Sequence, residues 1–279
     1  MRGPTLVILA AGRARRYGGI KQLAPIGKHG EATIDLIASD AVSAGFERFV
    51  IVINRETGPI IREHIESTWP SHLRVDFAFQ DTLRGTVDAV LSAEEAVGHD
   101  TPFGISNADD IYGPDAFRQL GRFLVEEQDN CLVGFRLENS LIGDLPVSRG
   151  TCRAHDGRLS AIVERRNVHR VDDHFIADDG LVPREIDPHV LVSMNLWGFQ
   201  PLVWPLLHRA MDEHDFELSA EVLLPTFAAE SMVRDHLIFR VLETDSRCIG
   251  VTHAEDLDLA QELMRAEIED GLRPDRAFG

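Results

Sequence analysis

The segment of this chain that most constrains its fold runs from residue 5 to residue 22. It opens with an apolar, β-branched stretch over Thr5–Ala10, which is typical of a buried strand. The strand enters a loop rich in glycine and basic residues, with the sequence Leu9-Ala10-Ala11-Gly12-Arg13-Ala14-Arg15-Arg16-Tyr17-Gly18-Gly19-Ile20-Lys21-Gln22. Small residues let the backbone approach a ligand, and glycines let N–H groups turn toward phosphate oxygens. We therefore predict a phosphate-binding loop at the carboxyl end of a buried strand.

Apolar, β-branched runs alternate with segments of helical spacing through the first half of the chain. The expected strands are Thr5–Ala10, Phe49–Ile53, Val75–Phe79, Phe103–Ser106 and Cys131–Leu137. The expected helices are Ala32–Ala44, Pro59–Ser67, Thr86–Val97 and Pro114–Glu127. Such alternation is typical of a mainly parallel sheet covered by helices.

The second half of the chain has a different pattern. Hairpin arms are expected over Thr151–Ala154 and Leu159–Glu164, because a turn-forming stretch separates them. The acidic segment Val171–Pro188 is expected to be an exposed loop or flap. The remaining expected elements are strands Val190–Phe199 and Ile238–Leu242, helices Leu202–Glu213, Ser219–Ala229 and Ala254–Asp270, and a loose tail over Pro274–Gly279.

Composition excludes several classes of partner. The formal charge of −18 argues against nonspecific binding to nucleic acid or to an anionic membrane, because such binding depends on clustered cations. No apolar run is long enough to span a membrane and the N-terminus lacks a signal-peptide core, so a soluble cytoplasmic protein is expected. Cys131, Cys152 and Cys248 lack the spacing of a metal cage or disulfide framework and are expected to be buried thiols.

The few lysines are placed unevenly. Lys21 and Lys28 are the only two in the chain, and both lie near Arg13, Arg15 and Arg16. This acidic protein therefore concentrates positive charge at the predicted phosphate-binding loop.

Three other phosphate-binding motifs fail on spacing. A Rossmann fingerprint needs G-x-G-x-x-G and an acidic residue closing the second strand, but that strand ends at Asn54. A Walker loop needs Ser or Thr after its lysine, whereas Gln22 follows Lys21. A glycine-rich kinase loop would need downstream kinase motifs, which are absent.

The loop resembles the signature of the sugar-phosphate nucleotidyltransferases, which has the form L-A-A-G-x-G-x-R followed closely by lysine. Gly12, Arg16 and Lys21 fall on its positions, while Ala14 replaces the second glycine. The resemblance implies that Arg16 and Lys21 are catalytic and stabilise the triphosphate and the departing pyrophosphate. It implies nucleotide contacts from the start of the loop, at Leu9, Ala10, Ala11, Gly12 and Arg13.

A second motif, Asn107-Ala108-Asp109-Asp110-Ile111-Tyr112-Gly113, directly follows a strand. Adjacent carboxylates at the end of a strand suit a hard divalent cation, although two aspartates before a glycine also form ordinary turns. In the order of the family, Asp109 is the expected Mg²⁺ ligand and Asp110 the weaker candidate. The family also places a further carboxylate where Gly250 stands, so either Glu255, Asp256 or Glu221 substitutes, or one protein carboxylate suffices.

Further site residues follow from the resemblance. Gln80, Gly85 and Thr86 resemble the segment that reads the base and lets the ribose approach. In the second half, Glu164 is expected to hold acceptor hydroxyls, Arg165 or Arg166 the acceptor phosphate, and Asn195 a polar group of the acceptor. A charged hairpin end is the alternative for the Glu164 segment, and Trp197 and Phe199 are expected in the core.

The resemblance implies a three-layer α/β/α sandwich with a Rossmann-like mixed, mainly parallel sheet and an inserted antiparallel substrate-binding part. We expect a single domain over residues 1–270, with a nucleotide-binding half over 1–137, an acceptor-binding half over 138–253 and a closing helix over 254–270. The implied partners are an NTP and a phosphorylated sugar or sugar-like molecule, with pyrophosphate released; a homo-oligomer is left open. A metal-dependent nucleotide-sugar glycosyltransferase and a catalytically silent nucleotide-binding regulatory protein remain as alternatives.

Overall fold

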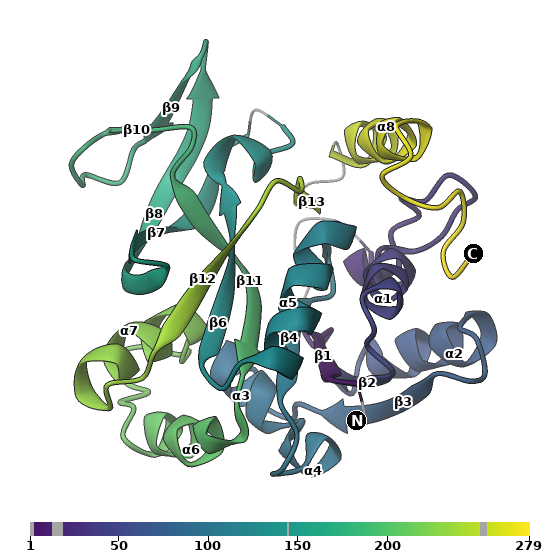
Figure 1. Cartoon of the computed structure of the whole chain (residues 1–279), viewed down its shortest axis with the longest axis horizontal. Helices are drawn as coiled ribbons and strands as arrows, with labels where there is room; N and C mark the ends of the chain where they lie inside the picture. Colours follow the sequence, from purple (N-terminus) through teal and green to yellow (C-terminus); the bar gives the residue numbers. More distant parts are fainter. Residues whose placement is uncertain (1–2, 13–18, 144, 252–255) are drawn as a thin grey trace.

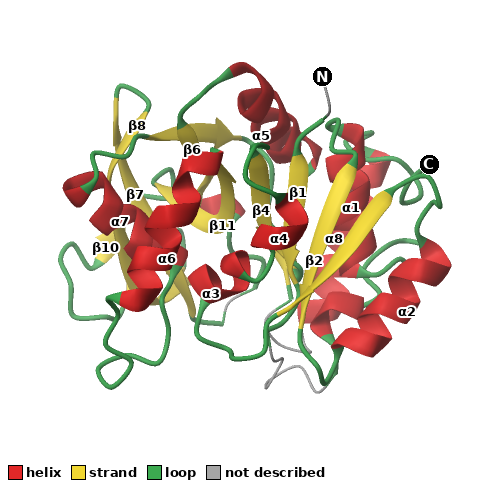
Figure 2. Ribbon diagram, turned by 90° about the horizontal axis from the view of Figure 1, so that it is seen from below, coloured by secondary structure: helices red, strands yellow, loops and turns green. Residues whose placement is uncertain are grey.

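The computed structural model describes residues 3–12, 19–143, 145–251 and 256–279. Helices cover both faces of a large mixed sheet in three layers, so the expected fold class is confirmed (Figures 1 and 2). The strands of the large sheet are β1 (Thr5–Leu9), β2 (Arg48–Ile53), β3 (Arg74–Phe79), β4 (Phe103–Asn107), β6 (Asn130–Arg136), β7 (Val147–His155), β8 (Arg158–Val171), β9 (His174–Ala177), β10 (Glu185–Ile186), β11 (Leu191–Phe199) and β12 (Phe239–Thr244). Strands β5 (Asp110–Ile111) and β13 (Ile249–Gly250) form a separate pair.

The α-helices are α1 (Thr33–Ser43), α2 (Gly58–Thr68), α3 (Thr86–Leu91), α4 (Glu94–Val97), α5 (Pro114–Glu126), α6 (Trp204–Asp212), α7 (Leu224–Arg234) and α8 (Asp256–Glu269). Three 3₁₀ turns accompany them, η1 (Lys21–Leu23), η2 (Leu137–Asn139) and η3 (Pro201–Val203). In the part of the chain that the structure describes, no helix is long and apolar enough to cross a membrane.

Strand order explains where a ligand site can form. Strands β3, β2, β1 and β4 are mutually parallel, so their carboxyl ends meet at one edge of the sheet. Strand β11 pairs antiparallel with both β4 and β6. Beyond β12 the antiparallel strands β8, β9 and β10 follow, and β7 pairs antiparallel with β11 and β8. The parallel and antiparallel parts of the sheet therefore adjoin at β4 and β11.

Alternating side chains bury both faces of the central strands. In β1, Leu6 and Ile8 pack with the helices α1, α2, α5 and α8, whereas Val7 packs with α3, α4, α6 and α7. Strands covered on both faces are near-continuously apolar, which is why their positions could be predicted. Trp197 and Phe199 are fully buried, and all three cysteines are buried free thiols, as expected.

Two expected elements differ in the structure. The helix expected over 86–97 is divided into α3 and α4, because the N–H of Ala93 bonds to Val90 O in a tighter turn. The helix expected over 219–229 begins five residues later as α7, because residues 220–223 run along the start of α3 instead. Pro225 then lies in the first turn, where its missing N–H is tolerated.

Two segments expected to be loose are held by buried contacts. The segment 171–188 contains β9 and β10, and Phe175 and Ile186 are buried there. The tail follows Arg273, whose buried guanidinium bonds to Asp40 at 2.6 Å, and Phe278 packs against the core. Most of the segment 171–188 is exposed, as expected, but its two short strands and the contacts of the tail were not predicted, because the anchors join residues that are distant in the sequence.

Candidate active site at the carboxyl edge of the sheet

Two amide side chains hold the start of the predicted phosphate-binding loop, residues 9–22, which is called the glycine-arginine loop below. Gln22 Nε2 donates to the carbonyl oxygens of Ala10 (3.2 Å) and Gly12 (3.3 Å), and Asn54 Nδ2 donates to that of Ala11 (2.8 Å). Within the described part of the chain, the N–H groups of Ala11 and Gly12 donate to no protein acceptor. Among the described residues, the carbonyl oxygens of Ala10, Ala11 and Gly12 therefore have donors, whereas the N–H groups of Ala11 and Gly12 have no protein acceptor and could bind an anion.

Of the basic residues predicted to act in the loop, the structure describes only Lys21. Arg13 and Arg16, together with Ala14, lie outside the described residues. Lys21 lies in η1, and its Nζ is 3.9 Å from Asp109 Oδ2, with only 15% of the lysine side chain exposed. A lysine from the first loop and an aspartate that follows β4 thus meet across the cleft.

Asp109 and Asp110 place two carboxylates on consecutive residues. Limited hydration and the neighbouring Asp110 charge raise the pKa of Asp109 to about 7, while Lys21 lowers it. Two adjacent carboxylates with one nearby ammonium form a site that additional positive charge would stabilise.

A chain of amide hydrogen bonds connects Asp110 to the core. Asp110 Oδ2 accepts from Asn107 Nδ2 at 2.8 Å, and Asn107 Oδ1 accepts from Asn195 Nδ2 at 2.8 Å. Asn195 Oδ1 in turn accepts from the indole N–H of buried Trp197 at 3.0 Å. Because the indole can only donate, it sets the orientation of both amides. Asp110 is therefore held by a hydrogen-bond chain that begins in the core.

Two cavities adjoin at this edge of the sheet. The larger, of about 600 Å³, lies beside the glycine-arginine loop, and the smaller, of about 370 Å³, lies under β7, β8 and β11. Thr86, Asn107, Asp109 and Leu223 line both cavities. A ligand in each cavity would therefore meet its neighbour beside Asp109.

Most of the residues expected to contact a nucleotide line the larger cavity, namely Leu9, Ala11, Gly12, Gln80, Gly85 and Thr86. Ala10 is fully buried instead. Gln80 Nε2 donates to Gly85 O and to Asp88 Oδ2, so only its carbonyl oxygen remains for a ligand. Sequence reasoning missed the supporting roles of Gln22 and Asn54, although their positions just after the loop and after β2 were visible.

Gly85 has a structural reason to be glycine. Its φ is +98°, and a Cβ there would overlap the carbonyl oxygen of Val222. The hydroxyl of Thr86 accepts a 2.8 Å hydrogen bond from the N–H of Leu224. The start of α3 is thus joined to residues 222–224, which form one wall of the cleft.

The residues expected to bind the acceptor separate in the structure. Glu164 and Asn195 line the smaller cavity, but Arg165 and Arg166 line neither cavity. Arg165 is buried and binds Asp179 through Nε at 2.6 Å. Limited hydration raises the pKa of Glu164, against the influence of Arg149 and Arg166. Arg149 lines the smaller cavity, and no spacing motif in the sequence marked it.

Gly250, the position where the resemblance implies a further carboxylate, lies against Asp110. Gly250 pairs with Asp110 across β13 and β5, and a Cβ at 250 would overlap Asp110 Oδ1. Asp256 lines the smaller cavity, Glu221 lines the larger, and Glu255 lies outside the described residues.

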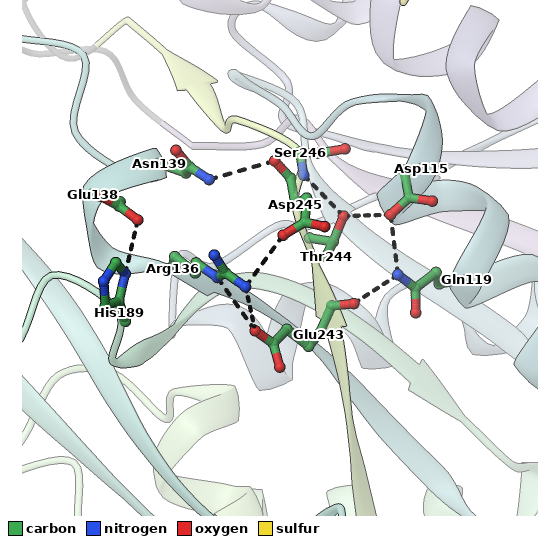
Figure 3. A network of polar contacts seen from close by, with 10 residues as sticks. All are labelled: Asp115, Gln119, Arg136, Glu138, Asn139, His189, Glu243, Thr244, Asp245 and Ser246. Carbon is green, nitrogen blue, oxygen red and sulfur yellow. Dashed lines mark hydrogen bonds and ion pairs between the residues drawn. The ribbon is translucent and has the colours of Figure 1, made fainter.

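A polar network holds the segment between β12 and β13 in place (Figure 3). The Thr244 hydroxyl donates to Asp115 at 2.8 Å and accepts from the N–H of Ser246 at 3.2 Å. Arg136 forms an ion pair with Asp245 at 3.4 Å. These contacts fix the course of the chain toward β13, and hence the backbone that lies against Asp110.

The described side chains would supply only some of the ligands of a divalent cation. Among the described residues, no group of three or more His, Cys, Asp or Glu side chains could hold a metal ion. Magnesium, however, is typically bound by one or two carboxylates together with phosphate oxygens and water. Asp109 and Asp110 match that smaller set.

The fold is of the α/β class, with a mixed sheet, and two adjoining cavities lie at the carboxyl edge of its parallel strands. Residues 5–140 match the model of the family described as Nucleotidyl transferase, which confirms the expected resemblance to the sugar-phosphate nucleotidyltransferases. No curated protein sequence matches the chain.

The solved structures that share the fold include the following two. One is a UDP-glucose pyrophosphorylase complexed with UDP-glucose, at 17% identity and a TM-score of 0.66, with 95% of this chain and 99% of that chain covered. The other is the inositol-1-phosphate CTP transferase from T. maritima, at 15% identity and a TM-score of 0.68, with 98% of this chain and 99% of that chain covered.

Proposed function

We propose that this protein transfers a nucleoside monophosphate from an NTP to a phosphorylated sugar or sugar-like acceptor, such as a cyclitol or polyol phosphate, and releases pyrophosphate. The observation that carries the proposal is the pair of adjoining cavities, which share Asn107 and Asp109. A transfer between two phosphorylated molecules requires two neighbouring sites whose reacting groups meet, and Lys21 lies at that meeting point.

In the proposed reaction, a phosphate oxygen of the acceptor attacks the α-phosphorus of the NTP in line. A new P–O bond forms while the bond from the α-phosphorus to the oxygen bridging to the β-phosphorus breaks, and its electron pair leaves with pyrophosphate. The attacking phosphate is already anionic, so no protein base is required. Catalysis then consists of positioning and charge neutralisation.

The residues of the cleft have distinct parts in this reaction. The N–H groups of Ala11 and Gly12 would bind triphosphate oxygens, and Lys21, with Arg16 as implied by the resemblance, would stabilise the departing pyrophosphate. Asp109 and Asp110 would hold Mg²⁺, which when bound neutralises phosphate charge. Asn107 and Asn195 would keep Asp110 oriented through their hydrogen bonds.

The test is a matrix of the common NTPs against phosphorylated acceptors in the presence of Mg²⁺, scored by pyrophosphate release. The panel includes glucose 1-phosphate, inositol 1-phosphate, a polyol phosphate and phosphocholine, with the unphosphorylated compounds as controls. We expect pyrophosphate only when an NTP and a phosphorylated acceptor are both present. Binding of NTP without pyrophosphate release across the panel, or glycosyl transfer from a nucleotide sugar, would contradict the proposal.

A further inference from the structure

The smaller cavity contains an uneven set of charges. Arg149 is the only cationic side chain among the described residues that line it. The carboxylates that line the same cavity are Asp109, Asp110, Glu164 and Asp256. Because like charges repel, a phosphate in this cavity is favoured beside the single guanidinium and disfavoured elsewhere along the protein wall.

Hydrogen bonds hold the guanidinium of Arg149 in place but do not occupy all of its N–H donors. Its Nε donates to Ser140 Oγ at 3.2 Å, its Nη2 to Ser140 O, and its Nη1 to Ser148 O at 2.8 Å. A guanidinium carries five N–H groups, so one on each terminal nitrogen remains available. Among the described residues, Arg149 forms no ion pair; its guanidinium bonds to neutral oxygens, and the carboxylates of Asp110 and Glu164 act on its charge without direct contact.

The other two arginines considered for the acceptor are placed differently. The fork of Arg165 is filled by Asp179 and by the carbonyl oxygen of Pro183. Arg166 is exposed and lines neither cavity. Arg149 on β7 instead lies beside Gly150, which pairs with Glu164 on β8, so a cation and a carboxylate occupy neighbouring strands over the same cavity.

We propose that Arg149 binds the phosphate group of the acceptor, in place of Arg165 or Arg166. This inference rests on the proposed function, and it defines the acceptor as a phosphate monoester that enters the smaller cavity with its phosphate between Arg149 and Asp109. The two remaining N–H groups of Arg149 match two oxygens of one phosphate, a geometry that lysine lacks.

Steady-state kinetics of the full chain test the inference, with an acceptor and NTP that the matrix identifies. Arg149→Gln should raise the KM for the acceptor roughly 100-fold and leave the KM for NTP within about twofold, since one bidentate charged contact is lost. Arg149→Lys should recover part of the loss. Arg153→Gln removes an exposed arginine of the same strand that lines neither cavity, and it should match wild type.

Inorganic phosphate provides a second measurement. It should inhibit wild type competitively against the acceptor, and Arg149→Lys, which keeps the charge, should weaken that inhibition. An unchanged acceptor KM in Arg149→Gln, or a large increase in Arg166→Gln instead, overturns the assignment while leaving the proposed function intact. Absence of pyrophosphate release by wild type across the whole matrix overturns both.

Discussion

Lys21 and Asp109 form a long ion pair in the cleft. Lys21 Nζ and Asp109 Oδ2 are 3.9 Å apart, beyond ordinary hydrogen-bond distance, although both point into the same cleft. An ammonium held near a carboxylate without a tight contact remains available to phosphate oxygens. The attraction between this ammonium and a phosphate is stronger where hydration is limited, because water and salt screen the same charge in bulk solution.

Replacement of Lys21 tests this arrangement at the level of one residue. Lys21→Ala should lower turnover roughly 100-fold, as removal of one preorganised charge stabiliser typically does. Lys28→Ala provides the control, because Lys28 is the only other lysine and pairs on the surface with Asp275. Turnover measured by pyrophosphate release should be unchanged in the control, and an equal loss in both variants would contradict the role of Lys21.

Sequence alone placed the residues whose spacing is local. Gly12 and Asp109 follow β1 and β4 closely, so they could be expected at the same edge of the sheet, and Lys21 was expected there from the family resemblance; all three line the larger cavity. Arg149 could not, because its role depends on Ser140 and on strands that pair across the second half of the chain.

Among the elements, α3 depends on a contact with the chain that precedes α7. Val222 donates to Arg84 O at 2.8 Å and accepts from the N–H of Val87 at 3.1 Å. These backbone bonds place Ala220, Glu221 and Leu223 beside the larger cavity, and they bring Val222 so close to Gly85 that a Cβ there would overlap the Val222 carbonyl oxygen.

Gly85→Ala should therefore weaken both stability and nucleotide binding. The new Cβ meets positive φ and the Val222 carbonyl together, so the expected cost is about 3 kcal/mol or more, with a raised KM for NTP. Gly98→Ala is the matched control, because its φ is +85° but its Cβ would meet nothing within 4 Å. Thermal melts should show a clearly smaller loss for Gly98→Ala, of about 1 kcal/mol; equal losses would show that the Val222 contact is unimportant.

The strand β8 is anchored to the loop after β9 by Arg165 and Asp179. Hydrogen bonds from Arg165 hold the pKa of Asp179 well below its usual range. A carboxylate with a lowered folded-state pKa stabilises the fold fully above its unfolded value of about 3.9, and this contribution disappears as the pH falls through the folded value.

The Tm of the Asp179→Asn variant, measured against pH, tests the ion pair between Arg165 and Asp179. The Tm of the variant should be lower than that of wild type at pH 7. The difference should shrink as the pH falls below about 4, because Asp179 of the unfolded chain then takes up a proton while the folded carboxylate is still charged, which favours unfolding of wild type. Asp173→Asn changes an exposed carboxylate in the nearby turn and should follow wild type throughout. A difference in Tm that stays constant down to pH 3 would contradict the charged pair.

The whole molecule joins a parallel half, beside the glycine-arginine loop, to an antiparallel half that covers the smaller cavity. Apolar runs sufficed to predict the strands of the first half, because β1, β2, β4 and β6 are buried on both faces. The structure of the second half and of the tail was harder to predict, because ion pairs between residues distant in the sequence hold these segments in place. Arg165 with Asp179 orders a segment expected to be a flap, and Arg273 with Asp40 holds the tail across 233 positions of sequence.

The position of bond cleavage tests the central claim most directly. Wild type is incubated with its preferred acceptor and with NTP labelled either at the α- or at the γ-phosphorus, with and without Mg²⁺. We predict that the α-label appears in a nucleotide joined to the acceptor and the γ-label in pyrophosphate, each only when the phosphorylated acceptor and Mg²⁺ are present. Transfer of the γ-label to the acceptor, or an α-label that never joins it, would contradict nucleotidyl transfer.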